Sequence, residues 1–292
     1  MPDPAKSPRW KKFVIVGPGL IGASIGLALK RSGAVETVVG VSRRRSTLQA
    51  ARSSGAIDSG SCRLEASVRD AAAVIVCTPV RRIAEQVIAV ANHMNGNGRA
   101  WITDVGSSKE WIVRRVGKAE RELGVKIPFV GSHPLAGSEQ SGPRAARADL
   151  YDGRLVIVTP TAKTPPWLAD EVDSFWTCLG AKVHRLTPTA HDRLLAATSH
   201  LPHTLATALA ATTLPDQLPF AATGWRDTTR IAAGDPDLWC DILLDNRTHL
   251  LKSLDNFEKK LAAIRHAVDV EDSRQLKRLL EEGKQRRDSL GS

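Results

Sequence analysis

The segment KKFVIVGPGLIGASIGLALKRSG, residues 11–33, is the strongest indication of the fold. It begins with a run typical of a buried β-strand, turns at a glycine-rich stretch over 17–22, and continues as a helical pattern that ends at Gly33. Similar runs later in the chain predict strands at 37–42, 72–79, 101–106, 127–131, 154–160 and 181–186, with helices between them that include 85–94 and 108–123. This alternation predicts a mainly parallel sheet with helices on both faces.

The pattern changes after Pro188, beyond which no strand is predicted. Residues 191–214 form a helical pattern with Pro202 as a kink. Asp235 and Pro236 are typical of a helix N-terminus, so we expect a long helix to begin there, followed by a last polar helix over about 270–287. The long helix carries apolar residues every three or four positions: Leu250, Leu254, Phe257, Leu261, Ile264 and Val268. This stripe predicts packing on a partner helix and favours a homodimer.

The composition excludes several classes of protein. Of 292 residues, 42% are hydrophobic, which is enough for two globular cores, and no apolar run approaches the roughly 20 residues that cross a bilayer. Four cysteines without C-x-x-C spacing and a polar N-terminus favour a reducing cytoplasm. The formal charge is +10, but no nucleic-acid-binding module is visible. We expect most basic clusters to be solvated faces and termini, and a field that gathers small anionic ligands fits as well.

Gly17, Gly19 and Gly22 form the pattern G-x-G-x-x-G directly after a strand and at the start of a helix, which is the context that gives the pattern meaning. Gly17 permits a tight turn, Gly19 lets a pyrophosphate approach the backbone, and Gly22 lets helix and strand pack closely. The helix N-terminus adds N–H donors for an anion. We expect a dinucleotide to contact these glycines and four further residues, Leu20, Ile21, Thr78 and Pro79.

These patterns together predict an α/β fold. We expect a Rossmann-type, mainly parallel sheet domain that binds the dinucleotide over residues 1–187, and an all-helical domain for substrate binding and dimerisation over residues 188–292.

The second predicted strand ends at Ser42, which Arg43, Arg44 and Arg45 follow. A carboxylate at this point would bind the ribose 2′-hydroxyl of NAD, whereas guanidinium groups bind a 2′-phosphate. We therefore favour NADP over NAD, with Ser42, Arg43 and Arg44 at the cofactor. The alternative is that the arginines form a solvated loop and NAD is the cofactor.

Four further segments carry polar residues where packing alone does not need them: 104–109, 131–142, 199–203 and 226–231. The first follows a strand and caps a helix, and the second follows a strand as a long glycine-rich loop. Because ligands of open α/β sheets bind beyond the carboxyl ends of the strands, we expect Ser107 and His133 to lie there.

The ordered motifs GPGLIGAS, SHPLAGSEQSG, SHLPH and WRDTTRIAAGDP resemble those of the prephenate and arogenate dehydrogenase family of tyrosine biosynthesis, and the resemblance covers about residues 11–285. It implies an NAD(P)-dependent oxidoreductase that oxidatively decarboxylates prephenate, a dianion, to 4-hydroxyphenylpyruvate. It assigns proton acceptance from the 4-hydroxyl to His133, and an imidazole with an ordinary pKa of about 6.5 suits that task. By the same resemblance Ser107 orients the hydroxyl and the histidine.

The resemblance also implies how the substrate is held. Arg230 matches an arginine that clamps a substrate carboxylate, and His203 matches a substrate-binding position. His200 would lie near the nicotinamide. Glu139 would receive the amine of arogenate, or gate the pocket and order Arg230. His203 and Glu139 together resemble the prephenate-using branch, whereas the arginine loop resembles NADP-using members, many of which take arogenate.

Other interpretations remain open. His200 and His203 are also compatible with simple packing, and because no third ligand motif accompanies them we expect no metal. A β-hydroxyacid-type dehydrogenase has a similar domain plan but relies on a catalytic lysine in its helical part. A dinucleotide-sensing regulator would keep the glycine turn without a convergent His133, Ser107 and Arg230. Since the chain ends shortly after the long helix, we expect no appended regulatory domain, and expect any tyrosine feedback to act at the active site.

Overall fold

A computed structural model describes residues 8–95, 99–137 and 140–291. Its contacts divide the chain into two compact units: Met1–Leu194 with Ala233–Asp245, and Leu195–Ala232 with Asn246–Ser292. The predicted division into domains at residue 187 stays a prediction.

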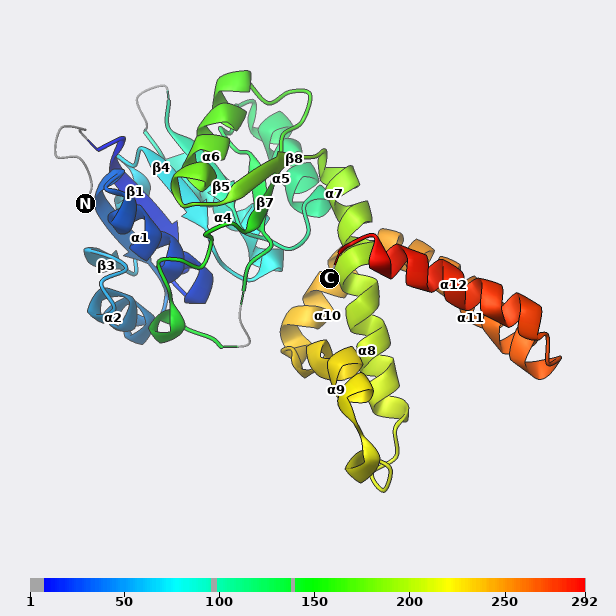
Figure 1. The fold of residues 1–292 in the computed structure, drawn as a ribbon. Helices are drawn as coiled ribbons and strands as arrows, with labels where there is room; N and C mark the ends of the chain where they lie inside the picture. Colours follow the sequence, from blue (N-terminus) through cyan, green and yellow to red (C-terminus); the bar gives the residue numbers. More distant parts are fainter. Residues whose placement is uncertain (1–7, 96–98, 138–139, 292) are drawn as a thin grey trace. The chain divides into compact units, whose positions relative to one another are not determined.

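The first unit contains all the strands of the described chain and the helices that pack on them (Figure 1). The strands are β1 (Trp10–Val16), β2 (Val35–Val41), β3 (Ser59–Ser61), β4 (Ala73–Val76), β5 (Trp101–Asp104), β6 (Gly131–Pro134), β7 (Leu155–Thr159) and β8 (Lys182–Arg185). The α-helices are α1 (Leu20–Ser32), α2 (Arg45–Ser53), α3 (Leu64–Val68), α4 (Val80–His93), α5 (Glu110–Leu123), α6 (Pro166–Cys178), α7 (Pro188–Leu195, ending at the boundary of the unit) and α10 (Pro236–Asp245).

The strands form two sheets. The larger sheet is parallel, with the strand order β3-β2-β1-β4-β5, and the smaller has the order β6-β7-β8, in which β6 and β7 are antiparallel. The predicted mainly parallel α/β fold is confirmed, with the difference that the last three strands form a sheet of their own. The short strand β3 was not predicted, because its sequence, SGS, lacks the β-branched and aromatic residues that indicate strands.

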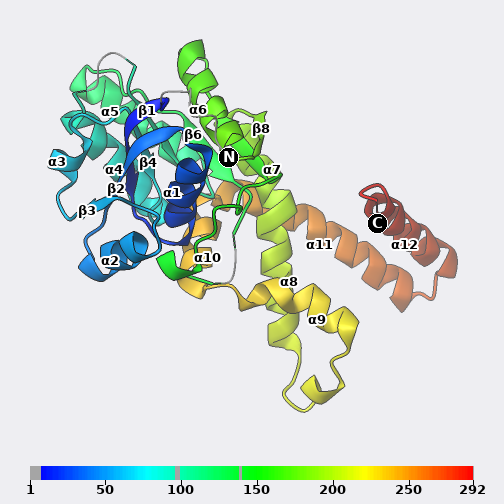
Figure 2. The same cartoon turned by 60° about the vertical axis from the view of Figure 1, so that its left-hand side comes forward.

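Helices cover both faces of the larger sheet (Figure 2). Successive side chains of a strand point to opposite faces, so β1 contributes Phe13 and Ile15 to one core and Val14 and Val16 to the other. The first core includes residues of α1 and α6, where the Phe175 ring stacks on Phe13 with centroids 5.2 Å apart. The second core includes residues of α3, α4 and α5. Burial on both faces explains why these strands read as continuous apolar runs.

The predicted strand over 127–131 is corrected. That segment makes only an isolated bridge to β5, between Ile102 and Phe129, and the strand β6 begins at Gly131. Pro128 has no N–H to donate, which interrupts a regular ladder, whereas Gly131–Pro134 pairs with β7. His133 therefore lies within a strand, opposite Ile157, and not in the loop that follows one.

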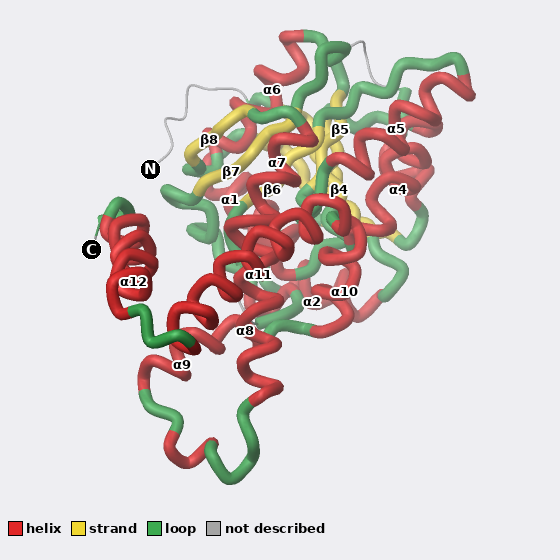
Figure 3. The backbone as a smooth tube through the Cα atoms, turned by 90° about the vertical axis from the view of Figure 1, so that its right-hand side faces the viewer, coloured by secondary structure: helices red, strands yellow, loops and turns green. Residues whose placement is uncertain are grey.

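Among its described residues, the second unit contains helices joined by turns and loops, and no strand (Figure 3). It contains a π-helical turn over Ala196–His200, α8 (Leu201–Thr212), a 3₁₀ turn over Leu218–Phe220, α9 (Thr223–Thr229), a 3₁₀ turn that begins at Arg230 at the edge of the unit, α11 (Arg247–Asp269) and α12 (Ser273–Asp288). Asp272 caps α12 by accepting a hydrogen bond from the Gln275 amide at 2.9 Å. Among the residues described in both units, no helix is long and apolar enough to span a membrane.

The kink predicted at Pro202 is a widened turn. The amide of Leu201 donates to the carbonyl of Ala196, five residues earlier, and α8 starts at the same point. Proline has no N–H for the usual bond to the fourth residue before it, and its ring crowds that carbonyl, so the backbone widens just before Pro202. The turn holds His200 at its last position.

The long helix predicted from Pro236 is two helices. Asp235 caps the start as predicted, since its Oδ1 accepts from the Asp237 amide at 2.9 Å. The chain leaves the helical conformation at Asn246, with φ −102° and ψ 23°, and α11 begins at the next residue. The first piece, α10, belongs to the first unit, where Arg81 of α4 lies 3.4 Å from Asp245.

The predicted apolar stripe lies on α11, and the chain itself covers only part of it. Leu250 is 7% exposed, whereas Leu261 is 52% and Val268 58% exposed. A helix that packs on a partner chain has such a stripe partly exposed when its own chain is considered alone.

Candidate active site

The glycine turn has the geometry that its pattern predicts. Gly17 has a φ of +86°, and a Cβ there would stand 2.7 Å from the Cys77 carbonyl oxygen. A Cβ on Gly22 would stand 2.6 Å from the Gly17 carbonyl oxygen, so the helix α1 crosses the turn at a distance that only glycine allows. Both glycines are therefore needed for the backbone itself.

Gly19 has a different role, because a Cβ there would meet no atom within 4 Å. The space beside it is open at the N-terminus of α1. Among the residues that the structure describes, no side chain caps this helix and its first turn holds no acidic residue. Open backbone and uncapped amides fit a pyrophosphate, which would accept hydrogen bonds from those amides.

Two loops meet at the carboxyl ends of β2 and β3. The amide of Ser42 donates to the carbonyl of Ser61 at 3.2 Å, and Arg43 and Arg44 are exposed beside it. A recess of about 450 Å³ lies between Arg45 and the loop that follows β3, which contributes Arg63. No carboxylate belongs to the described residues that line this recess, so its polar lining suits an anion.

Thr78 and Pro79 follow β4 and border the turn. The Thr78 methyl group lies 2.8 Å from the position of a Cβ on Gly17, and its hydroxyl donates to Gln86 at 2.6 Å. Pro79 is the N-cap residue of α4. Leu20 and Ile21 are half-buried in the first turn of α1.

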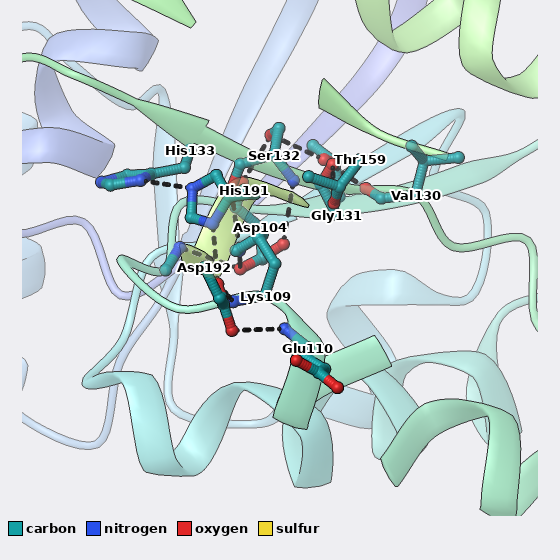
Figure 4. Close-up of polar contacts among 12 residues, drawn as sticks. Asp104, Lys109, Glu110, Val130, Gly131, Ser132, His133, Thr159, His191 and Asp192 are labelled. Carbon is teal, nitrogen blue, oxygen red and sulfur yellow. Dashed lines mark hydrogen bonds and ion pairs between the residues drawn. The ribbon is translucent and has the colours of Figure 1, made fainter. Parts of the chain in front are cut away.

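A buried polar cluster lies where β5 and β6 come together (Figure 4). Asp104 and Lys109 are ion-paired with their side chains fully buried, and the Lys109 ammonium also donates to the Ser132 carbonyl at 2.9 Å. The Ser132 amide donates to Asp104 Oδ1 at 3.1 Å. Burial lowers the pKa of Lys109, and Asp104 opposes that shift. These contacts fix the residue that immediately precedes His133.

Asp192 of α7 caps α5. Its two carboxylate oxygens accept from the backbone amides of Lys109 and Glu110, at 2.8 and 2.9 Å. Burial alone would raise the pKa of Asp192, but the hydrogen bond from His191 and these two amides outweigh it, so the pKa is lowered. The expected cap from the 104–109 segment is thus corrected: Ser107 is half-buried in the loop before α5, and the capping carboxylate comes from a remote helix.

A chain of hydrogen bonds runs from Asp192 through His191 to His133 (Figure 4). Asp192 Oδ1 lies 2.7 Å from His191 Nδ1, and His191 Nε2 lies 2.9 Å from His133 Nδ1. An ionised carboxylate only accepts, so His191 donates from Nδ1. Burial lowers the pKa of His191, against the opposing pull of Asp192, so the ring is neutral near pH 7 and its Nε2 accepts. His133 then donates from Nδ1, which makes Nε2 its basic nitrogen.

His133 is 8% exposed and is held from two sides. The backbone of β6 pairs with β7, and the ring is fixed through His191. A proton-accepting nitrogen on a rigid strand, with its tautomer set by a neighbour, is suited to general base catalysis.

The other predicted substrate residues belong to the second unit. His200 is 1% exposed, and its Nδ1 lies 3.0 Å from the Asn246 amide nitrogen. His203 is 5% exposed, and burial lowers its pKa. The two histidines lie three residues apart along one helical segment, and Arg230 is exposed at the start of a 3₁₀ turn.

Glu139 lies outside the described residues. Within the described ones, no group of three histidine, cysteine, aspartate or glutamate side chains could hold a metal ion. The structure thus brings together His133, His191 and Asp192 in the first unit, and His200 and Asn246 in the second.

Sequence reasoning missed the residues that act behind His133. His191 and Asp192 stand 58 and 59 positions after it, on a helix whose pattern reads as ordinary packing. The adjacent pair of a histidine and an aspartate was the one available signal, but a pair alone does not say which element it faces. Lys109 lies in the polar segment 104–109, but the sequence indicated no role for this lysine.

Comparison with known proteins agrees with this geometry. A family model described as prephenate dehydrogenase, nucleotide-binding domain, matches residues 25–185, and one described as prephenate dehydrogenase, dimerization domain, matches residues 187–282. The prephenate dehydrogenase of Bacillus subtilis (strain 168) is 34% identical over 287 residues, which are 95% of this chain and 76% of that protein. The cyclohexadienyl dehydrogenase of Zymomonas mobilis is 33% identical over 90% of either chain.

Solved structures give the same result. The crystal structure of prephenate dehydrogenase from A. aeolicus in complex with hydroxyphenyl propionate and NAD⁺ superposes with a TM-score of 0.88 at 32% sequence identity, covering 98% of this chain and 100% of that one. The fold and the glycine turn define an oxidoreductase that uses a nicotinamide dinucleotide. The chain belongs to the prephenate dehydrogenase family, which confirms the family predicted from the motifs.

Proposed function

We propose that the protein catalyses the oxidative decarboxylation of prephenate to 4-hydroxyphenylpyruvate. Hydride leaves C4 and CO₂ leaves C1. The proton taken from the 4-hydroxyl while C4 becomes a carbonyl returns to that oxygen as the ring becomes aromatic, which gives 4-hydroxyphenylpyruvate. The observation that carries the proposal is the hydrogen-bonded chain from Asp192 to His133 in a member of this family. When bound, the nicotinamide supplies the hydride acceptor.

His133 is the general base of the proposed reaction. Its Nε2 accepts the proton of the 4-hydroxyl as the C4 oxygen becomes a carbonyl, and His191 holds the ring in the tautomer that leaves this nitrogen basic. Asp192 stabilises the positive charge that His133 acquires, through the neutral ring between them. Ser107 orients the hydroxyl toward His133.

The second unit supplies the groups that bind the substrate. Arg230 clamps a carboxylate, since a planar guanidinium matches both carboxylate oxygens. By the family resemblance, His203 would add a hydrogen bond and His200 would lie near the nicotinamide. The net charge of +10 favours the approach of a dianion.

NADP is the proposed cofactor. Ser42, Arg43 and Arg44 would hold the 2′-phosphate at the end of β2, and the neighbouring recess adds Arg45 and Arg63. If these arginines bind the phosphate, Arg43→Gln raises KM for NADP⁺ about tenfold and leaves KM for NAD⁺ nearly unchanged. Equal effects on both cofactors would assign NAD instead.

A homodimer in the cytoplasm is the proposed state. The exposed apolar residues of α11 and the match to a dimerization domain support the dimer, and four free cysteines suit a reducing compartment. Analytical ultracentrifugation tests the mass, for which the chain alone gives 31.5 kDa.

One assay tests the reaction. Purified protein is supplied with prephenate or arogenate, each with NAD⁺ and with NADP⁺, and the absorbance of the reduced cofactor is followed. Turnover of prephenate supports the proposal, whereas no turnover of either substrate overturns it. Arogenate is the second candidate, because one close relative is a cyclohexadienyl dehydrogenase. A higher kcat/KM for arogenate would make it the substrate.

A further inference from the structure

A large cavity lies in the first unit, apart from the glycine turn. Its volume is about 820 Å³, and it is bounded by α5 from Val113 onward, the segment that follows α5, and the loop before α6. Its lining includes Met94 and Ala100, which lie on the amino side of β5, whereas the glycine turn follows the carboxyl end of β1. These are opposite ends of the parallel strands, and none of the described lining residues belongs to the glycine turn, so the cavity is separate from that turn. Gly131, two residues before His133, does line the cavity.

The walls of the cavity are mainly apolar. Val113 and Val116 of α5 face it together with Phe129, Trp167 and Leu168. Trp167 and Phe129 are half-buried, so each keeps part of its ring accessible. A cavity of this volume with aromatic walls is in the range that encloses a small organic molecule.

The charged side chains of the cavity are mostly cationic. Arg121, Lys126 and Lys163 line it, and Glu120 is the only acid among its described lining residues. Glu120 is already engaged, since its carboxylate accepts from the Ile127 amide at 2.9 Å. The surplus of positive charge favours a ligand with an anionic group.

Gly117 keeps the cavity wide. It lies inside α5 and lines the cavity, and a Cβ there would meet only Arg121 Nη1, at 3.9 Å. A glycine inside a helix is less stable than alanine, and here no neighbouring atom forbids a side chain. The volume that the missing side chain leaves is part of the cavity.

We propose that this cavity binds a small amphipathic organic anion, an aromatic ring system that bears one carboxylate or sulfonate. The ring lies against Trp167 and Phe129, and the anionic group lies among Arg121, Lys126 and Lys163. The site goes beyond the dehydrogenase reaction and does not depend on it.

The first experiment uses 1-anilinonaphthalene-8-sulfonate, an aromatic sulfonate whose fluorescence rises in apolar surroundings. It is titrated into the full-length protein with NADP⁺ present, and with NAD⁺ in a parallel series. We expect saturable binding that neither cofactor displaces. Gly117→Leu fills the cavity without disfavouring the helix and is expected to weaken binding at least tenfold, which is about 1.4 kcal/mol. Gly117→Ala, which adds a single carbon, is expected to weaken binding much less.

The second experiment tests whether the positive charges of the cavity contribute to binding of the anionic group. Lys126→Gln combined with Lys163→Gln is expected to weaken binding of the sulfonate severalfold, but not binding of the neutral analogue N-phenyl-1-naphthylamine. Lys118→Gln is the matched control, because Lys118 is exposed on the same helix and pairs with Glu122 at 3.4 Å, outside the cavity. Circular dichroism and unfolding midpoints verify that each variant is folded.

Three results would overturn the proposal: no saturable binding to the wild type, equal binding to Gly117→Leu, or displacement by either cofactor. Equal loss of the sulfonate and of the neutral probe in the double lysine variant would overturn the assignment of an anion. None of these readouts depends on turnover, so failure of the dehydrogenase assay and failure of this site are distinguishable.

Discussion

The two units hold their candidate residues in different ways. His133 is 8% exposed, paired in a strand and hydrogen-bonded through His191 to a helix-capping carboxylate. Arg230 is exposed at the start of a 3₁₀ turn. A buried, bonded side chain is preorganised for chemistry, whereas an exposed one becomes ordered when its ligand arrives. We therefore expect changes at His133 to act mainly on kcat, and changes at Arg230 to act mainly on KM for the substrate.

The largest effect is expected from His133→Asn. Asparagine keeps a hydrogen-bonding side chain but cannot take up the hydroxyl proton, so kcat is expected to fall about 10²- to 10⁴-fold. Cofactor binding, measured by fluorescence titration, is expected to remain unchanged because the glycine turn is untouched.

The matched control is His184→Asn. His184 is exposed in β8, and it lies in the same cross-strand row, since Ile157 of β7 pairs with both histidines. It is expected to leave kcat unchanged. Retained turnover in His133→Asn would remove that residue from the mechanism.

Asp192→Asn tests the chain behind the base. The amide can donate to His191 Nδ1, which moves the His191 proton to Nε2 and forces His133 to accept at Nδ1. Its basic nitrogen is then protonated, so kcat is expected to fall about 10²-fold, with little change in KM. The free energy of unfolding is expected to fall by about 1–2 kcal/mol, because a charged acceptor of helix amides is lost.

Asp272→Asn is the control for capping alone. Asp272 caps α12 through the Gln275 amide, remote in sequence from the site, and asparagine is a good cap. We expect normal kcat there. A kcat loss in Asp192→Asn that merely follows its stability, and recovers at lower temperature, would argue for a structural role only.

Arg230→Lys tests the substrate-binding role proposed for the exposed arginine of the second unit. Lysine keeps the charge but loses the two-pronged geometry, so KM for prephenate is expected to rise about tenfold while kcat changes less. Arg226→Gln is the control, because Arg226 is also exposed and bonds the Ala221 carbonyl at 3.1 Å. If Arg230→Lys lowered kcat and left KM unchanged, the assignment of substrate binding to Arg230 would be wrong.

The fold was more predictable than the site, because the fold follows largely from interactions between residues that are close in sequence. The strands and helices around Gly17–Gly22 follow from periodicity and from glycine chemistry, which depend on neighbours in sequence. The break at Asn246 does not, because its side chain is engaged by His200, which stands 46 positions earlier. The strand that carries His133 shifted because pairing with β7 decides where β6 begins.

Site residues that belong to a recognisable motif could be predicted from the sequence. Site residues that only the packing of the folded chain brings to the site could not. His133 follows from its motif and from the family resemblance. Its partner His191 follows from neither, because only the folded chain brings α7 against β6. Asp192 was hidden for the same reason, since the helix that it caps lies 82 positions earlier.

The smallest effect concerns stability and pH. Burial lowers the pKa of His191 in the first unit and of His203 in the second, so the unfolded chain binds these protons more readily. The free energy of unfolding is therefore expected to fall as the pH drops below about 6.5 and to stay level above it. Asp192 does not contribute in this window, because its lowered pKa matters only below the ordinary carboxyl range.

Urea unfolding between pH 8 and pH 5 measures how the free energy of unfolding depends on pH. The variants His191→Gln and His203→Gln each remove one titrating ring. We expect both variants to show a flatter dependence than the wild type; parallel curves would mean that the rings are protonated alike in the folded and unfolded chains.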